Sequence, residues 1–249
     1  MKNLFDTKFD LIISLGENCG AALHMRGSGL KTSAYPFDWI VGMPFEKRLE
    51  LIENHFHGFL EKENMRPINR KFPFVHAPFL DTRTNFHFLH DFSADHPFEE
   101  TFPEIKSKYN RRIARLYADV AKAPKTLFVW CGMHSTVSPQ ALMEGRERLS
   151  RFFKKEIYLL ALQNDKTVAG EPRCEQLSPY LIRFEFDFRE DPATQMMGDK
   201  KAFRAILSGI SLKGKWKNRL RKIRHSIICG FIPFKKLRVA TRLSLREKG

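Results

Sequence analysis

Short apolar runs recur along the chain and predict buried strands. Four of them stand near residues 10–15, 126–131, 156–162 and 181–187. Each is too short for a helix, and each holds few polar side chains, which is typical of strands that are buried on both faces. We therefore expect these four strands to form the centre of one sheet.

Helical periodicity separates most of these strands. Apolar side chains at helical spacing predict longer helices from Pro44, from Pro103, from Pro139 to about Phe153, and from Lys200 to Leu212. A short helix over residues 21–26 follows the first strand, which puts Cys19 at or near the first helical turn.

The stretch between the first strands and the later ones has a weaker pattern. Residues 61–82 contain prolines and show no period, so we expect a loop there. Residues 33–39 are aromatic and contain a proline, which favours a loop or a short edge strand. Residues 85–92 alternate between apolar and polar side chains and predict a strand or hairpin arm.

The alternation of strands and helices predicts the fold class. It favours an α/β fold of three layers, with a mainly parallel sheet and helices on both faces. The alternative is a papain-like α+β fold, in which a cysteine-bearing helix packs on an antiparallel sheet. Reactive residues of parallel sheets lie in loops after the strands. Three loops qualify: Gly16–Gly20, Gly132–Ser138 and the one after Phe188.

Composition limits the classes of protein. The chain has 249 residues, of which 43% are hydrophobic, enough for one sizeable domain over residues 1–212. No run approaches the roughly 18 apolar residues of a membrane span. Cysteines stand at 19, 131, 174 and 229 without the C-x-x-C spacing of a metal site, which is typical of free thiols in a reducing compartment. We predict no metal and no cofactor, because no ligand spacing, phosphate-binding loop or dinucleotide motif is complete.

Cys19 is the candidate nucleophile. A cysteine in a tight turn at a helix start meets a positive electrostatic potential and several backbone N–H groups. Those groups suit an oxyanion formed during acyl transfer, and Ser14 and Asn18 offer further donors. The competing interpretation is a small buried thiol that packs the turn.

His90 is the candidate base. Alternation along its strand puts His90 on the face of Phe88, and Asp91 on the opposite face. Asp38, Asp91 and Asp199 are the candidate acids to orient its ring, although neighbours on a strand point apart, which argues against Asp91. His134 follows another core strand and is the alternative base. The competing interpretation of His90 is a surface histidine beside a solvated aspartate.

Four sequence blocks resemble a known family. They are Leu11–Cys19, Leu30–Trp39 with its Tyr-Pro-Phe-Asp-Trp run, His90–Phe92 and Lys108–Arg112. Together they are similar to the bacterial family named "putative papain-like cysteine peptidases", over most of residues 9–212. The resemblance implies Cys19 as nucleophile and His90 as base. A cysteine nucleophile with a histidine base predicts a hydrolase or acyltransferase, and the sequence leaves the substrate open among peptides, esters, thioesters and acylated sugars.

Positive charge is concentrated at the C-terminal end. The formal net charge is +15, and residues 213–249 hold 13 Lys and Arg with one acid, which leaves about +3 on residues 1–212. Trp216, Leu220, Ile223 and Ile227 make an apolar stripe among these cations, a pattern of membrane-surface helices. We therefore expect a cytoplasmic protein that is peripheral at the inner face of an anionic membrane, and no nucleic-acid partner.

The basic C-terminal tail also suggests a biological process in which the protein takes part. It is similar to the basic ends of bacterial glycosyltransferases that build cell-surface polysaccharides, so a link to polysaccharide synthesis is expected. The alternative from a different functional class is a non-catalytic protein that recruits enzymes of that machinery.

Overall fold

The computed structural model describes residues 4–69, 76–189 and 199–214. Its largest sheet has the strand order β2-β7-β8-β10-β9. These strands are β2 (Leu11–Ser14), β7 (Thr126–Gly132), β8 (Ile157–Asn164), β10 (Leu181–Phe186) and β9 (Arg173–Ser178). The first four run parallel to one another, and only β9 is antiparallel. The predicted α/β class and its mainly parallel sheet are therefore confirmed.

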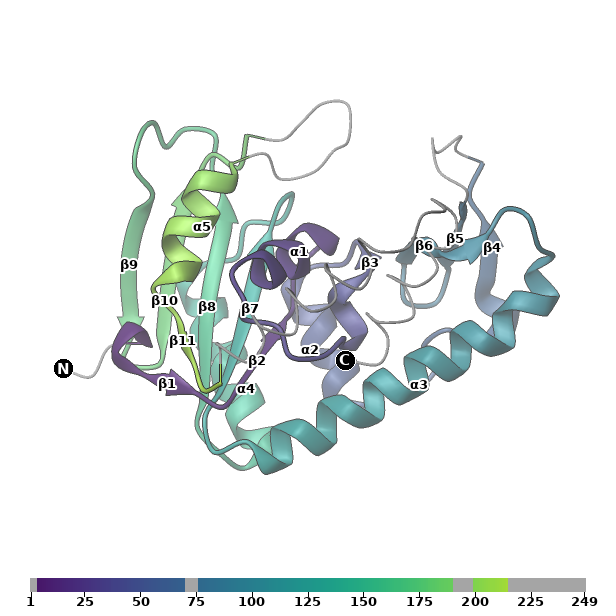
Figure 1. Ribbon diagram of the computed structural model, residues 1–249, viewed down its shortest axis with the longest axis horizontal. Helices are drawn as coiled ribbons and strands as arrows, with labels where there is room; N and C mark the ends of the chain where they lie inside the picture. Colours follow the sequence, from purple (N-terminus) through teal and green to yellow (C-terminus); the bar gives the residue numbers. More distant parts are fainter. Residues whose placement is uncertain (1–3, 70–75, 190–198, 215–249) are drawn as a thin grey trace, which may run out of the picture.

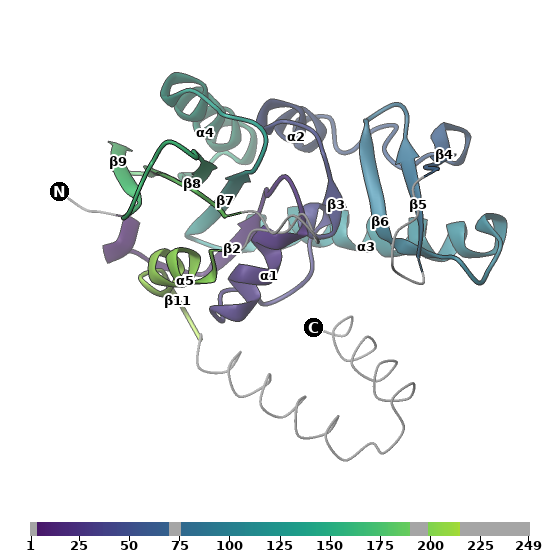
Figure 2. The same ribbon diagram turned by 90° about the horizontal axis from the view of Figure 1, so that it is seen from above.

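Helices cover both faces of this sheet, as the strand–helix alternation predicts (Figure 2). One face carries α1 (Cys19–Gly27) and α5 (Lys200–Ser208), and the other carries α2 (Phe45–Glu53) and α4 (Pro139–Phe153). Strands β2 and β7 are buried along their whole length, because both faces are covered.

A second, smaller sheet lies beside the first. Its strand order is β3-β6-β5-β4, and every pairing in it is antiparallel. The strands are β3 (Ile40–Val41), β6 (Phe86–Ser93), β5 (His76–Asp81) and β4 (Met65–Pro67), and the 3-10 turns η2 (Pro36–Asp38) and η3 (Lys62–Asn64) precede β3 and β4. The predicted loop over 61–82 is thus wrong in part, because Pro67 and Pro78 interrupt any alternation in β4 and β5.

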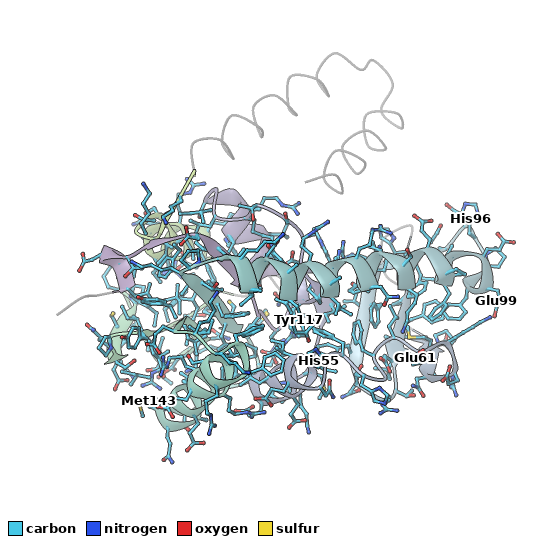
Figure 3. The ribbon with its side chains drawn as sticks, turned by 90° about the horizontal axis from the view of Figure 1, so that it is seen from below. His55, Glu61, His96, Glu99, Tyr117 and Met143 are labelled. Carbon is cyan, nitrogen blue, oxygen red and sulfur yellow. The ribbon has the colours of Figure 1, made fainter. Side chains whose placement is uncertain are left out.

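Helix α3 (Phe98–Lys122) runs beneath both sheets and joins them (Figure 1). It begins before Pro103, since Glu99 and Glu100 in its first turn suit the positive end of the helix dipole. Tyr117 donates from its hydroxyl to the carbonyl of Ile52, and its ring lies 5.0 Å from that of His55 (Figure 3). One apolar cluster includes residues of both sheets, so they share a core.

Two predicted helices end early. Helix α2 stops at Glu53, because His55 and Phe56 adopt positive φ of 56° and 58°. Helix α5 stops at Ser208, and the next residues form β11 (Ser211–Leu212), which pairs in parallel with β1 (Lys8–Phe9) after the 3-10 turn η1 (Leu4–Asp6). Among the described residues, no helix is both long and apolar enough to cross a membrane.

Candidate active site

Cys19 is the first residue of α1, directly after the turn that follows β2. Asn18 caps the helix, because its Oδ1 accepts from the Gly20 N–H at 2.8 Å. A side chain at Gly16 would place its Cβ 2.2 Å from that of Ala21, so only glycine lets the helix come this close to the turn. The tight strand–turn–helix unit thus fixes the thiol at a helix N-terminus.

The two predicted oxyanion donors both have partners inside this turn. Ser14 Oγ accepts from the Gly16 N–H at 3.1 Å, and Asn18 Nδ2 contacts the sulfur of Met133 at 2.8 Å. Each side chain therefore helps to fold the turn. Their role toward an oxyanion stays a prediction.

Glu17 binds the neighbouring loop, a feature that sequence reasoning missed. It is only 6% exposed, and its carboxylate accepts from the backbone N–H groups of Met133 and His134 at 2.7 and 2.9 Å. It also accepts from the backbone and the hydroxyl of Ser135. Glu17 therefore joins two of the three loops expected to carry reactive residues.

The structure brings His90 to Cys19. The Nε2 atom of His90 lies 3.9 Å from the Cys19 sulfur, although His90 belongs to strand β6 and Cys19 to helix α1, 71 positions apart in the chain. This is a loose contact of the kind that tightens when substrate binds. The thiol is 8% exposed and the imidazole is half-buried.

The expected face of His90 is wrong. Pairing of β5 with β6 shifts register, so that one residue of β5 lies opposite the three residues 89–91 of β6. Asp91, not His90, then lies on the side of Phe88, because both contact Tyr109. This irregularity turns His90 away from α3 and toward α1.

The three candidate acids each have other bonds. Asp91 accepts from the Tyr109 hydroxyl at 2.8 Å and from Lys108 at 2.7 Å. Asp38 accepts from Lys31 and from the Tyr35 N–H in the core. Asp199 caps α5 and pairs with Arg189. Asp91 still acts on His90 through its charge, which raises the pKa of the imidazole against the effect of burial. Which acid orients the ring stays a prediction.

Two aromatic side chains that sequence reasoning did not single out surround the imidazole. The ring of Trp39 lies 6.4 Å from that of His90, and the ring of His76 lies 6.0 Å from it, each edge to face. Trp39 belongs to the Tyr-Pro-Phe-Asp-Trp run, whereas His76 carries no signal in the sequence. The side chain of His134, the alternative base, is exposed.

Electrostatics favours a neutral Cys–His pair. Burial raises the pKa of the Cys19 thiol, although its own backbone N–H opposes this. Burial lowers the pKa of His90, and His76 lowers it further while Asp91 raises it. A thiol that resists ionisation beside an imidazole that resists protonation is held as thiol and free base near neutral pH.

The described ranges contain no cluster of side chains that could bind a metal ion. No group of three or more His, Cys, Asp or Glu residues is arranged there to hold an ion. Cys131 is a buried thiol in β7, and Cys174 is an exposed one in β9. Cys229 lies outside the described residues.

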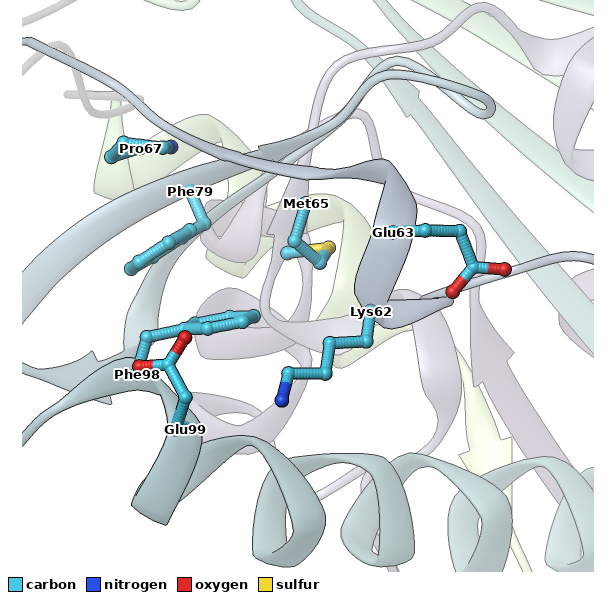
Figure 4. A pocket seen from close by; sticks show the side chains of 7 residues that line it. All are labelled: Lys62, Glu63, Met65, Pro67, Phe79, Phe98 and Glu99. Carbon is cyan, nitrogen blue, oxygen red and sulfur yellow. The ribbon is translucent and has the colours of Figure 1, made fainter.

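One pocket lies away from this site, where β4, β5 and the start of α3 meet (Figure 4). Its volume is about 640 Å³. Aromatic and aliphatic side chains line it together with charged ones; the residues are Lys62, Glu63, Met65, Pro67, Phe79, Phe98 and Glu99. None of the candidate catalytic residues lines it.

Comparisons with known proteins place the chain in a family. One curated relative is "Uncharacterized protein R408" of Acanthamoeba polyphaga mimivirus, 27% identical over 138 residues, which are 48% of this chain and 60% of the relative. The chain thus spans less than two thirds of that viral protein. The expected bacterial origin stays a prediction, and no solved structure matches. The pattern of the family described as "putative papain-like cysteine peptidase" matches residues 10–155, more than half of the 249, and the chain therefore belongs to that family.

Proposed function

We propose that the protein is a cysteine-nucleophile hydrolase or acyltransferase, with Cys19 as nucleophile and His90 as base. The observation that carries this is the 3.9 Å contact between the Cys19 sulfur and His90 Nε2. Membership of a family described as cysteine peptidases supports it. The position of the thiol at the start of α1, where N–H groups face outward, supports it further.

The chemistry follows from the neutral pair. As the Cys19 sulfur attacks a carbonyl carbon, His90 Nε2 takes the thiol proton, and the carbonyl oxygen becomes an oxyanion near the first turn of α1. The oxyanion collapses, the leaving group takes the proton from His90, and a thioester remains on Cys19. Water or an acceptor hydroxyl then loses a proton to His90, attacks the thioester and releases the thiol.

The neutral pair also separates this site from enzymes with a preformed thiolate. Thiolates next to a positively charged histidine have strongly lowered pKa values. Here burial raises the pKa of Cys19, so proton transfer must accompany attack. Reactivity of Cys19 should therefore depend strongly on His90.

The test measures acylation of Cys19 by a peptide thioester, followed by mass spectrometry of the adduct. We expect His90→Ala to slow acylation by about 10²-fold or more, the usual size of general-base catalysis. His134→Ala is the matched control, because its side chain is exposed. Equal acylation of wild type and His90→Ala would remove the catalytic pair and favour the non-catalytic binding protein.

The basic tail supports a second proposal. We infer that residues 213–249 bind an anionic membrane face and link the enzyme to cell-surface polysaccharide synthesis. Residues 215–249 lie outside the described residues, so this proposal is supported by sequence alone: 13 Lys and Arg against one acid. Co-sedimentation with anionic vesicles should be lost in a 1–212 truncation. Equal sedimentation of both forms would contradict it, and binding to DNA alone would move the partner to nucleic acid.

A further inference from the structure

Helix α1 carries a cation on the same face as the candidate nucleophile. Arg26 follows Cys19 by seven residues, which are two helical turns, so the two side chains leave one face about 10 Å apart along the axis. Helix α1 therefore fixes the spacing between the backbone positions that carry the thiol and the guanidinium.

Trp39 connects these two ends of the face. Its ring centroid lies 5.4 Å from the guanidinium carbon of Arg26, and its ring is 6.4 Å from that of His90. Arg26 and Trp39 are both half-buried, so each keeps surface that a ligand can contact. Cys19, His90, Trp39 and Arg26 thus form a continuous row, which we call the α1 row.

The charges beside the α1 row are mostly positive. Arg26 and Arg112 lie close enough to Lys31 to lower its pKa, which burial lowers first and Asp38 partly restores. Asp38 itself is bound by Lys31, with Nζ–O distances of 2.7 and 2.6 Å. Asp38 is therefore already paired, and Asp91, beside the His90 end of the row, is bound by Lys108.

We propose that the α1 row binds an acyl substrate with a carboxylate or other anionic group about 10 Å from the reacting carbonyl. Arg26 binds the anion, and Trp39 forms the wall between the anion and the catalytic pair. In an extended peptide this distance corresponds to about three residues. The inference rests on the proposed thiol chemistry and names the substrate class for the same site.

A structural role for Arg26 makes a different prediction. A cation in the last turn of α1 stabilises the helix, and its stacking on Trp39 fixes that ring. That role affects every substrate equally. Only an anion-binding role makes the rate depend on the charge of the substrate.

The test uses two pairs of peptide thioesters as probes. The two members of a pair differ at one position only, which is Glu in one and Gln in the other. In the first pair this position is the third residue before the thioester carbonyl, in the acyl part. In the second pair it is the third residue after that carbonyl, in a peptide that carries the leaving thiol. The measurement is the rate of Cys19 acylation for each probe, at low and high salt. We expect the Glu form of one pair to react about tenfold faster in wild type, the effect of one charge-assisted hydrogen bond.

Variants of Arg26 then show whether this residue causes the preference for the Glu probe. Arg26→Met should bring the ratio of the Glu and Gln rates to about one, while Arg26→Lys should keep most of the preference. Any effect of Arg26→Met through the Trp39 ring changes both rates alike, so the ratio of the two rates is the readout. Arg111→Met is the matched control, because it removes the same charge from an exposed position on α3. Circular dichroism of each variant checks that α1 is still folded.

The outcomes separate this inference from the proposed function. Cys19 acylation that depends on His90, but at equal rates within both probe pairs, overturns the anionic substrate class and leaves the catalytic pair standing. A preference that survives Arg26→Met also overturns it. Acylation that is independent of His90 removes the proposed function, and this inference with it.

Discussion

The nucleophile and the base are held in place by different means. Cys19 is positioned locally, by a buried parallel strand, the close approach at Gly16 and a cap from Asn18, its immediate neighbour. His90 lies on a small antiparallel sheet at a register shift, beside an aspartate held by α3. The Cys19 side should therefore keep its geometry when distant contacts change, whereas the His90 side depends on α3 staying docked.

The buried Lys31–Asp38 pair lies in the chain between Cys19 and His90, and its loss should have the largest effect on stability. Asp38→Asn leaves Lys31 buried without its carboxylate, so we expect a loss of about 3–5 kcal/mol in the free energy of unfolding. Glu50→Gln is the control, because the Lys47–Glu50 pair is exposed and should change by less than about 1 kcal/mol. Urea denaturation measures both. Similar losses in the two variants would show that the buried pair does not join the regions.

Glu17 tests the Cys19 side alone. Glu17→Gln keeps the shape but weakens the bonds to the Met133–Ser135 backbone, so we expect a loss of about 2 kcal/mol by the same denaturation. Cys19 acylation should change little in the folded fraction, because the cap of α1 stays intact. A large loss of acylation would show that the nucleophile also depends on distant contacts.

Two tyrosines of α3 test the His90 side. Tyr109→Phe removes the hydroxyl that binds Asp91, and Tyr117→Phe removes one that binds the Ile52 carbonyl far from the site. Each should cost about 1 kcal/mol of stability. Only Tyr109→Phe should slow Cys19 acylation, by several-fold, and alter its pH profile. Equal rates for the two variants would mean that Asp91 does not position His90.

The smallest expected effect is a change in how the free energy of unfolding depends on pH. Because the pKa of His90 is lowered in the folded state, its contribution to stability is present above about pH 6.5 and is lost as pH falls through the folded pKa. His90→Gln should flatten this loss below about pH 6.5. Thermal melts across pH measure it, with His134→Gln as the control. An unchanged acid dependence in His90→Gln would assign the loss to other groups.

The Cys19 side could be predicted from the sequence better than the His90 side. The four parallel strands and the turn at Cys19 were readable, because they rest on apolar runs and on residues next to one another in the chain. The face of His90 was not readable, because an irregular register between β5 and β6 decides it. Likewise β4 and β5 were missed, since Pro67 and Pro78 interrupt any alternation.

Site residues divide in the same way. Cys19 and His90 were named from turn chemistry and from the family resemblance. Glu17, His76 and Trp39 were not assigned a place at the site, because each reaches it through partners far away in the sequence. The buried pair of Lys31 and Asp38 shows the same limit, since neither residue signals burial by its type.

The pairing of β2 has a consequence for synthesis of the chain. Leu11 pairs with Thr126, so β2 has no partner in its sheet until 115 more residues have been made. At about 5–20 residues per second this takes roughly 6–23 s. During that time the strand that leads to the nucleophile is an apolar segment with both edges open, and such segments pair readily with other chains. The strand that leads to the nucleophile therefore cannot complete its sheet before β7 has been synthesised, so the rate of translation sets the earliest time at which the site can form.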